Sequence, residues 1–265
     1  YLQWFYETVV LLYELLSETG SIYVHIGSNV SHYVKVVTDS VFATENYLNE
    51  VVWKRSDAHS DVGQGAQHYG RLHDVILVYS KSMQYTWNQP YEQHSAEYLA
   101  SHYSNVEPET GRRYELADMT GPGGAAKGNP SYEVMGITRH WRYSKLKMQE
   151  LIAAGRVVQP SPGAIPRYKR YLDEMKGRPL QDVWTDIPFI NSQAQERAGY
   201  PTQKPEALLE RIVNASSNEG DIVLDCFCGS GTTAMVAEKL NRCWVACDLG
   251  RFAIQTTRKR LLSID

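Results

Sequence analysis

The chain has 265 residues, of which 43% are hydrophobic and 22% are charged, and its formal net charge is −3. These values are typical of a folded globular protein. No apolar run is long enough to span a bilayer, and the N-terminus lacks the basic start and cleavage site of a signal peptide, so we expect a cytoplasmic protein without a membrane segment.

Helices and strands alternate over the first 82 residues. Apolar residues at helical spacing predict helices over residues 1–19 and 29–42. Short apolar, β-branched runs predict strands over residues 21–26, 50–53 and 75–79.

A polar, glycine-rich stretch over residues 56–70 favours a loop. Asp57, His59 and Asp61 lie within it at a spacing that suggests metal ligands. Such a spacing in a flexible loop is more often solvated, so we predict no metal site.

Residues 83–197 have weak periodicity and a different composition. Tyr and Trp recur there between Arg and Lys, and residues 101–180 hold 13 Lys/Arg against 8 Asp/Glu, whereas the remainder holds 14 against 22. A basic segment in an acidic protein indicates a polyanion-binding face, although simple solvation of these charges is the alternative. Short helices are predicted over residues 144–154 and 167–175.

The strongest pattern lies between Asp221 and Asp248. An apolar strand over residues 222–224 ends at Asp225, and Gly229 and Gly231 form a turn before a helix over residues 233–240. A second strand over residues 244–246 is followed by Asp248. A strand, a glycine turn, a helix and a strand form the usual cradle for an adenosine-containing cofactor.

The charge at the first strand end discriminates between cofactors. Gly229, Gly231 and Ala234 fit the dinucleotide pattern, with Asp248 placed for a ribose hydroxyl. However, the Asp225 carboxylate would repel a pyrophosphate, whereas it would attract the ammonium and sulfonium groups of S-adenosylmethionine. We therefore favour S-adenosylmethionine over NAD; a purely structural cap is the third interpretation of Asp225.

Four cysteines lie within or beside the two predicted strands of this cradle. Cys226, Cys228, Cys243 and Cys247 lack the usual zinc-knuckle spacing. We expect buried, reduced thiols and no metal.

Three sequence motifs resemble a known enzyme family. DCFCGSGTT at residues 225–233 and WVACD at residues 244–248 resemble motifs I and II of the S-adenosylmethionine-dependent DNA amino-methyltransferases, and YPTQKP at residues 200–205 resembles their motif X. The order of motifs resembles the class that places its catalytic motif first and its cofactor motifs last. Cys226 departs from the proline that is usual in this family.

The resemblance implies an α/β fold with a methyltransferase (Rossmann-like) sheet and an inserted, mixed target-recognition domain. Its parts would be residues 1–82 and 198–265, which form the methyltransferase domain, and residues 83–197, which form the insertion. Thr202 and Lys204 would lie beside the methionine carboxylate of the cofactor. The implied cofactor-binding residues are Asp225, Phe227, Cys228, Gly229, Gly231, Thr232, Asp248, Thr202, Lys204 and Pro205.

The family's catalytic tetrapeptide, Asp-Pro-Pro-aromatic, is absent, because the sequence contains no Pro-Pro pair. Asn129-Pro-Ser-Tyr132 is superficially similar, but it follows a glycine-rich loop and not a buried strand, so we assign no catalytic residue. We expect the tetrapeptide upstream of Tyr1, in a longer protein, and hence a seven-stranded sheet that is incomplete at its N-terminal part, in which the strand at Ile222 lacks one neighbour.

The resemblance also implies double-stranded DNA as the substrate, with adenine N6 favoured over cytosine N4. The residues expected at the DNA or the target base are Tyr79, Arg112, Arg113, Arg139 and Arg142; for Tyr79, plain packing at a sheet edge is an equal alternative to stacking on the base. A restriction subunit or a second copy of the chain is an expected partner. The alternatives are an NAD-type oxidoreductase and a DNA-binding protein without catalytic activity.

Overall fold

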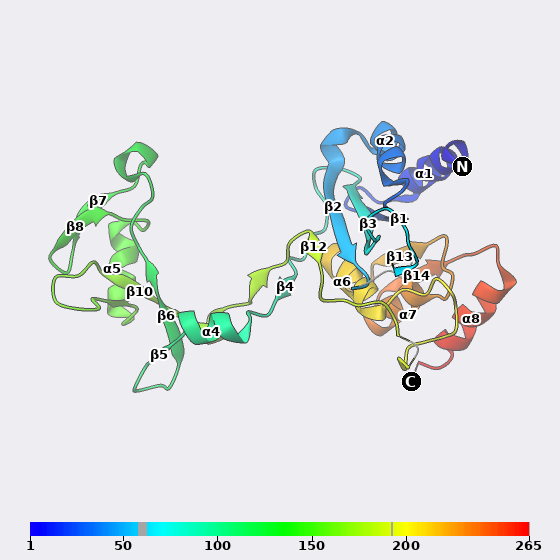
Figure 1. The fold of residues 1–265 in the computed structure, drawn as a ribbon. Coiled ribbons are helices and arrows are strands. Elements are labelled where there is room, and N and C mark those ends of the chain that lie inside the picture. Colours follow the sequence, from blue (N-terminus) through cyan, green and yellow to red (C-terminus); the bar gives the residue numbers. More distant parts are fainter. Residues whose placement is uncertain (58–62, 192, 265) are drawn as a thin grey trace. The chain divides into compact units, whose positions relative to one another are not determined.

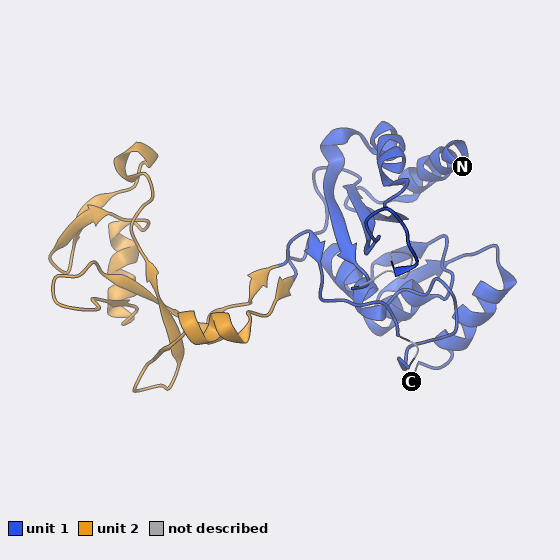
Figure 2. Cartoon of the chain, in the orientation of Figure 1, with its two compact units in different colours: residues 1–90, 180–265 blue, residues 91–179 orange. Residues whose placement is uncertain are grey.

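A computed structural model describes residues 1–57, 63–191 and 193–264, and its elements fall into two compact units (Figures 1 and 2). Unit 1 comprises residues 1–90 and 180–265, and unit 2 comprises residues 91–179. Unit 2 is narrower at both ends than the predicted 83–197 insertion. The flanking segments belong to unit 1 because they bond to it: Asn88 N donates to Ala215 O at 2.7 Å, and Val52 N donates to Asp182 O at 2.8 Å.

Unit 1 holds helices and strands from both ends of the chain. Its first elements are α1 (Leu2–Leu15), β1 (Ser21–Gly27), α2 (Ser31–Phe42), a 3₁₀ turn (Thr44–Asn46), β2 (Tyr47–Lys54) and β3 (His73–Ser80). After unit 2 the chain continues with β12 (Val183–Trp184), α6 (Glu206–Ser216), β13 (Ile222–Asp225), α7 (Thr232–Lys239), β14 (Cys243–Ala246) and α8 (Arg251–Leu261). None of the helices that the structure describes is both long and apolar enough to cross a membrane.

The larger sheet of unit 1 has the order β1-β3-β2-β12. Its strand β3 is antiparallel to β1 and β2 and is buried on both faces. Alternate residues point to opposite faces of a strand, so Val75 and Leu77 pack with α1 and α2, whereas Ile76 and Val78 pack with α6. The continuous apolar run of the sequence therefore corresponds to a doubly covered strand.

Tyr79 follows the same alternation, and this corrects its assignment to the target-base pocket. It lies in phase with Val75 and Leu77 and is fully buried beneath α2. Its hydroxyl donates to Asp39 Oδ1 at 2.6 Å, and burial raises its pKa above the ordinary tyrosine value. Tyr79 is a core residue, without an exposed ring face on which a base would stack.

The smaller sheet pairs β13 with β14 in parallel, with Ile222 opposite Cys243 and Leu224 opposite Val245. Among the described residues β13 has no second hydrogen-bonded neighbour, as the sequence predicted. These four side chains are exposed, with Ile222 at 73%.

The cysteines of this region are only partly as expected. Cys228 is buried and Cys226 is half-buried, but Cys243 and Cys247 are exposed. The prediction of buried thiols is wrong for Cys243, which lies on an exposed face of β14, and for Cys247, which follows that strand.

Unit 2 is built from short elements. They are β4 (Tyr91–Glu92), α4 (Ala96–His102), β5 (Asn105–Val106), β6 (Arg113–Asp118), the 3₁₀ turn η2 (Gly124–Lys127), β7 (Ser131–Val134), β8 (Ile137–His140), α5 (Lys145–Ala153), β9 (Val157–Val158), β10 (Arg167–Tyr171), the 3₁₀ turn η3 (Leu172–Glu174) and β11 (Arg178–Pro179). Strands β5-β6-β10-β9 form its main sheet, and β7-β8 form a hairpin.

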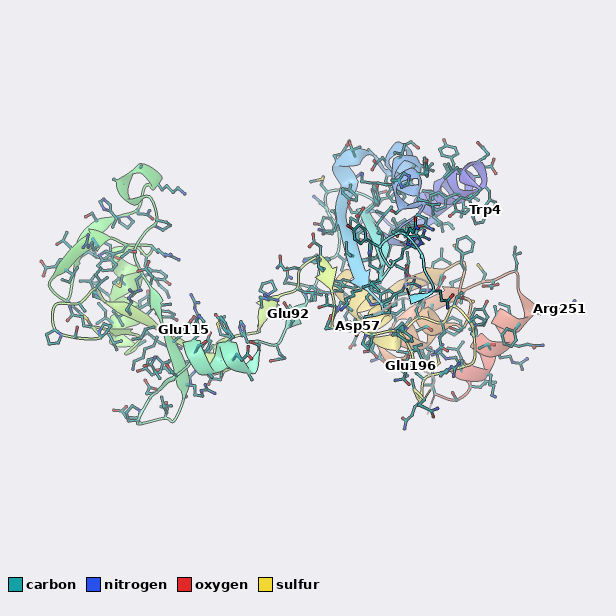
Figure 3. All side chains as sticks on the ribbon, viewed as in Figure 1. Trp4, Asp57, Glu92, Glu115, Glu196 and Arg251 are labelled. Atoms are coloured by element: carbon teal, nitrogen blue, oxygen red, sulfur yellow. The ribbon has the colours of Figure 1, made fainter. Side chains whose placement is uncertain are left out.

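The helix predicted over residues 167–175 is instead strand β10 followed by η3. Pairing with β6 decides this outcome: Tyr171 lies opposite Tyr114, and Arg170 lies opposite Glu115, to which it donates at 2.6 Å. Figure 3 labels Glu115 in unit 2. Cross-strand partners of this kind outweigh local propensity.

The core of unit 2 lies between α5 and the hairpin. Trp141 is fully buried there and donates its indole N–H to Tyr132 O at 2.8 Å. The helix predicted over residues 144–154 is confirmed as α5, with Ser144 Oγ accepting from Lys147 N at its start.

Candidate cofactor site

The glycine turn of unit 1 joins the end of β13 to the start of α7. Gly229 and Gly231 have positive φ angles of 50° and 74°, which glycine adopts at little cost. A Cβ on Gly231 would lie 2.4 Å from Thr257 Cγ2 on α8. The turn therefore requires glycine at residue 231 for its backbone conformation and for the close approach of α8.

The acidic residues at the two strand ends both bond to this turn. Asp225 Oδ1 accepts from Phe227 N at 3.1 Å, and Asp225 Oδ2 accepts from Thr233 Oγ1 at 2.5 Å. Asp248 Oδ2 accepts from Gly229 N at 2.9 Å, and its Oδ1 accepts from Gly250 N at 2.8 Å. The two carboxylates are thus fixed around the turn, and each oxygen retains acceptor capacity for a ligand.

The segment before α6 packs against the same turn. Thr232 Oγ1 donates to Lys204 O at 3.2 Å, and Pro205 is buried at the N-cap of α6. Thr202 is exposed. The structure therefore brings the residues of the predicted motif X to the start of α7, as the sequence interpretation required.

Lys204 is a half-buried cation at this junction. Burial lowers the pKa of its ammonium; Asp74 and Asp225 act in the opposite direction, while Arg55 lowers it further. Its Nζ donates to Thr202 O at 3.0 Å, and no carboxylate oxygen of the described residues lies within 4.0 Å of it. A partly desolvated ammonium without a close carboxylate favours an anionic ligand.

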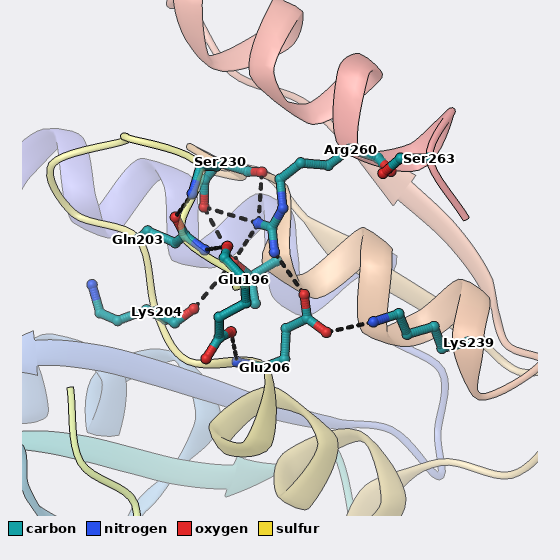
Figure 4. A network of polar contacts seen from close by, with 10 residues as sticks. Glu196, Gln203, Lys204, Glu206, Ser230, Lys239, Arg260 and Ser263 are labelled. Carbon is teal, nitrogen blue, oxygen red and sulfur yellow. Dashed lines mark hydrogen bonds and ion pairs between the residues drawn. The ribbon is translucent and has the colours of Figure 1, made fainter. Parts of the chain in front are cut away.

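A partly buried ion-pair network, which was not predicted from the sequence, holds these segments together (Figure 4). Arg260 of α8 is 9% exposed and donates to Ser230 O at 3.0 Å, Thr232 Oγ1 at 2.9 Å and Glu206 Oε1 at 2.8 Å. Lys239 donates to Glu206 Oε2 at 2.6 Å. The network connects α6, α7 and α8. Its residues lie so far apart in the chain that no local sequence pattern predicts their contact.

The side chains of the turn differ in accessibility. Phe227 is 56% exposed and contacts Trp4 of α1, with 5.6 Å between ring centroids. The Cys228 thiol instead lies 3.7 Å from Thr257 Oγ1, and burial raises its pKa. Burial also raises the pKa of Cys226 to about 11. Neither thiol is therefore an activated thiolate at neutral pH.

A second charged group adjoins Lys204 at the end of the larger sheet. Asp74 Oδ2 lies 3.1 Å from His25 Nε2, and Asp74 Oδ1 lies 3.5 Å from Arg55 Nε. Burial acts to raise the pKa of Asp74, but the hydrogen bond and charge of His25, together with the charges of Arg55 and Lys204, outweigh it. The pKa of Asp74 is therefore lowered overall. Neither Asp74 nor Arg55 was predicted from the sequence as a site residue. Of the metal motif considered at residues 57–61, His59 and Asp61 lie outside the described residues.

The arginines predicted to contact DNA all lie in unit 2, but their environments differ. Arg112 donates to Asp173 and Glu174 at 2.7 Å and stacks 3.8 Å from the centroid of Tyr171. Arg113 donates to two backbone carbonyls at 2.9 Å. Arg142 Nε donates to Thr120 O at 2.8 Å, and Arg139 is exposed on β8. Arg112 and Arg113 are therefore already bonded to other groups of unit 2.

The fold is similar to that of a solved structure titled M1.HpyAVI–SAM complex. The TM-score is 0.55 at 15% identity, and the match covers 97% of this chain and 81% of that one. At this identity the likeness bears on the fold alone. It supports the predicted α/β methyltransferase architecture.

Two curated relatives extend the comparison to sequence. Type II methyltransferase M.EcaI of Enterobacter cloacae is 33% identical over 263 residues, which are 98% of this chain and 57% of that protein. The StyLTI Mod subunit of a type III restriction-modification enzyme from Salmonella typhimurium is 28% identical over 254 residues, 91% of this chain and 38% of that protein. The chain thus spans about half or less of their lengths. A family profile described as DNA methylase matches residues 1–259, and the chain belongs to this DNA methylase family.

Proposed function

We propose that this chain holds S-adenosylmethionine and duplex DNA for methyl transfer to an exocyclic amino group of a base. The observation that carries the proposal is the charge pattern of the cradle. A half-buried cation, Lys204, and a carboxylate, Asp225, both adjoin the start of α7, where Lys204 O accepts from Thr232 and Asp225 accepts from Thr233. The charge of Asp225 also acts on the pKa of Lys204. The amino-acid end of S-adenosylmethionine has the complementary carboxylate and ammonium.

Each predicted residue has a role in this proposal. Lys204, with Thr202, would bind the carboxylate of the cofactor, and Asp225 its ammonium. Asp248 would accept from the ribose hydroxyls, while Gly229 and Gly231 let the backbone approach the ligand. Phe227, Cys228, Thr232 and Pro205 would shape the cradle around it. When bound, S-adenosylmethionine supplies an electrophilic methyl group.

The residues of the chain would contribute mainly binding and orientation to the reaction. An amino group in a duplex is paired, so its base must leave the stack before it can react. A group that orients the amino nitrogen toward the methyl carbon supplies much of the catalysis. This sequence contains no Pro-Pro pair of the family's catalytic tetrapeptide, and we assign no catalytic residue in it.

Membership of the family supports further proposals about the target base, the cellular location and the partners of the chain. We favour adenine N6 over cytosine N4, a cytoplasmic location with access to chromosomal DNA, and a restriction subunit or a second copy as partner. The similarity to a protein named as the Mod subunit of a restriction-modification enzyme supports the restriction partner. The alternative is a protein that binds cofactor and DNA without transferring a methyl group.

Titration calorimetry tests the cofactor assignment on the full chain. We expect S-adenosylmethionine to bind and NAD to give no heat. Asp225→Asn should weaken S-adenosylmethionine binding by about 10- to 100-fold, the loss expected for a hydrogen bond to a charged group. Binding of NAD without binding of S-adenosylmethionine would refute the proposal. Product analysis after incubation with DNA and S-adenosylmethionine would distinguish N6-methyladenine, N4-methylcytosine and no transfer.

A further inference from the structure

We propose that duplex DNA contacts unit 2 through one basic surface, formed by Lys127, Arg139, Arg142 and Lys145, and not through Arg112 and Arg113. This inference rests on the proposed function, because it names the part of the chain that holds the DNA. Four observations support it: the local charge, the partners of each cation, the way the segments are tied together, and the small side chains between them.

The net positive charge of unit 2 is confined to one stretch. Residues 119–149 hold five Lys/Arg and a single acid, Glu133. The rest of unit 2 holds eight Lys/Arg and nine Asp/Glu, so its charges almost cancel. The basic composition seen over residues 101–180 therefore belongs to η2, the β7–β8 hairpin and the start of α5. A polyanion would be attracted to this part of the unit.

Most cations outside this stretch already have carboxylate partners. Lys169 donates to Glu107 at 2.8 Å, Arg170 donates to Glu115 at 2.6 Å, and Arg156 pairs with Glu174. Before any of these cations could bind a phosphate, its ion pair with the carboxylate would have to break. Their charges hold strands and turns of unit 2 together and add little to an external field.

By comparison, the cations of the basic surface are available to bind phosphates. Lys127, Arg139 and Lys145 are exposed, and no carboxylate oxygen in the described part of the chain lies within 4.0 Å of their charged nitrogens. Arg142 is also exposed; its Nε bonds to Thr120 O, and its Nη2 is 3.8 Å from Asp118 Oδ2. Lys127, Arg139 and Lys145 are thus uncompensated surface cations, which neutralise phosphates on binding DNA. Arg142 would join them through the guanidinium N–H groups that its contacts with Thr120 and Asp118 leave free.

Backbone hydrogen bonds tie the segments that carry these cations. Gly121 N donates to His140 O at 2.8 Å, and Trp141 N donates to Pro130 O at 2.9 Å. The glycine-rich loop over residues 121–128 is thus fixed to the end of β8, and Arg142 and Lys145 follow directly. A Cβ on Gly124 would lie 3.6 Å from His140 Nδ1. These contacts place the loop that carries Lys127 beside the end of β8, the strand that carries Arg139.

The loop between the cations is suited to close approach. Residues 121–128 are Gly, Pro, Ala and Lys only, and Gly123, Gly124 and Gly128 have positive φ. With side chains this small, the loop backbone would come near a sugar–phosphate strand. Arg139 and Arg142 carry guanidinium forks, which bind phosphate or the guanine edge in the major groove.

Fluorescence anisotropy with a duplex of about 25 base pairs, the length of a typical protein-bound site, tests this surface over a range of salt concentrations. The triple variant Lys127→Gln/Arg139→Gln/Lys145→Gln should weaken binding. The slope of log K against log salt should become shallower by about 0.9 for each phosphate that the variant no longer neutralises. The matched control is Lys176→Gln, an exposed cation of unit 2 outside the surface that has no carboxylate within 4.0 Å among the described residues; it should retain the slope of the unmodified chain.

The outcomes separate the two proposals. If the unmodified chain binds the duplex and the triple variant retains both its affinity and its salt slope, the surface is wrong and the proposed function stands. If the unmodified chain binds no duplex at low salt, the DNA-binding part of the proposed function fails together with the surface. A melting curve of the triple variant that matches the unmodified chain would show that any loss of binding is not a loss of fold.

Discussion

The cradle of unit 1 and the main sheet of unit 2 use charge in opposite ways. In the cradle, Lys204 is half-buried, and among the described residues its ammonium has only a backbone carbonyl as a hydrogen-bond acceptor. Asp225 accepts from a backbone N–H and a hydroxyl. In the sheet of unit 2, Lys169 and Arg170 are each paired with a carboxylate. Incompletely compensated charge indicates a ligand-binding site, whereas charge paired with a carboxylate of the same unit stabilises the fold.

The largest effect should come from the backbone of the cradle. Gly231→Ala would add a Cβ 2.4 Å from Thr257 at a positive φ. Overpacking costs about 1–3 kcal/mol and a left-handed conformation about 1–2 kcal/mol, so we expect the free energy of unfolding of unit 1 to fall by about 2–5 kcal/mol. Urea unfolding followed by tryptophan fluorescence measures this change.

Gly220→Ala is the matched control for this variant. Gly220 also has a positive φ, of 83°, but a Cβ there would meet no atom within 4 Å. It should therefore cost only the conformational part, about 1–2 kcal/mol. Equal losses in the two variants would show that the contact between the turn and α8 does not restrict residue 231.

Lys204→Met should separate ligand binding from stability. A lost charge-assisted hydrogen bond is worth about 1.5–3 kcal/mol, so S-adenosylmethionine should bind about 10- to 100-fold more weakly by calorimetry. The pKa of Lys204 is lowered in the folded state, so keeping it charged costs folding free energy at neutral pH. This cost is complete below the folded pKa and disappears as pH rises from the folded pKa to the higher unfolded pKa. At neutral pH the variant should therefore be at least as stable as the unmodified chain.

The control for this variant is Lys259→Gln, an exposed cation on α8. It should change neither cofactor affinity nor stability. If Lys204→Met lowers stability and leaves cofactor affinity unchanged, Lys204 is a structural residue and the contrast between the two regions fails at this position.

The sequence predicted the cradle well because its signals are local. The strand, the two glycines and the helix follow one another between Ile222 and Lys239, and the backbone demands of the turn leave few alternatives to glycine. The strands β1, β2 and β3 were predicted for the same reason. The open edge of β13 was predicted from the family's order of motifs.

The features that the sequence did not predict depend on distant partners. Arg260 and Glu206 are 54 residues apart and meet only in the folded chain. Strand β10 was predicted as a helix because its partner β6, which decides its conformation, is about 50 residues away. For Tyr79 a base-stacking role and core packing remained open alternatives, because only the packing of α2 over β3 shows which face is covered.

Arg112→Gln tests the other side of the contrast. Its guanidinium donates to Asp173 and Glu174 and stacks on Tyr171, so its removal should lower the melting temperature of unit 2. DNA affinity should stay close to that of the unmodified chain, because the cation already has internal partners. A large loss of DNA affinity without a change in melting would restore Arg112 as a DNA contact.

The smallest effect is a pH dependence of unit 2. Hydrogen bonds from Lys169, Thr110 and Tyr171 lower the pKa of Glu107 from 4.5 to about 2. A carboxyl whose folded pKa is depressed stabilises the fold above its unfolded pKa and loses this contribution as pH falls through the folded value. Unit 2 should therefore lose stability between about pH 4.5 and pH 2, and Glu107→Gln should flatten this part of the profile, as measured by thermal melting at each pH.

Glu109→Gln, two residues away and exposed, should leave the profile unchanged. An identical acid profile for both variants would mean that the pairing of Glu107 with Lys169 does not stabilise the sheet.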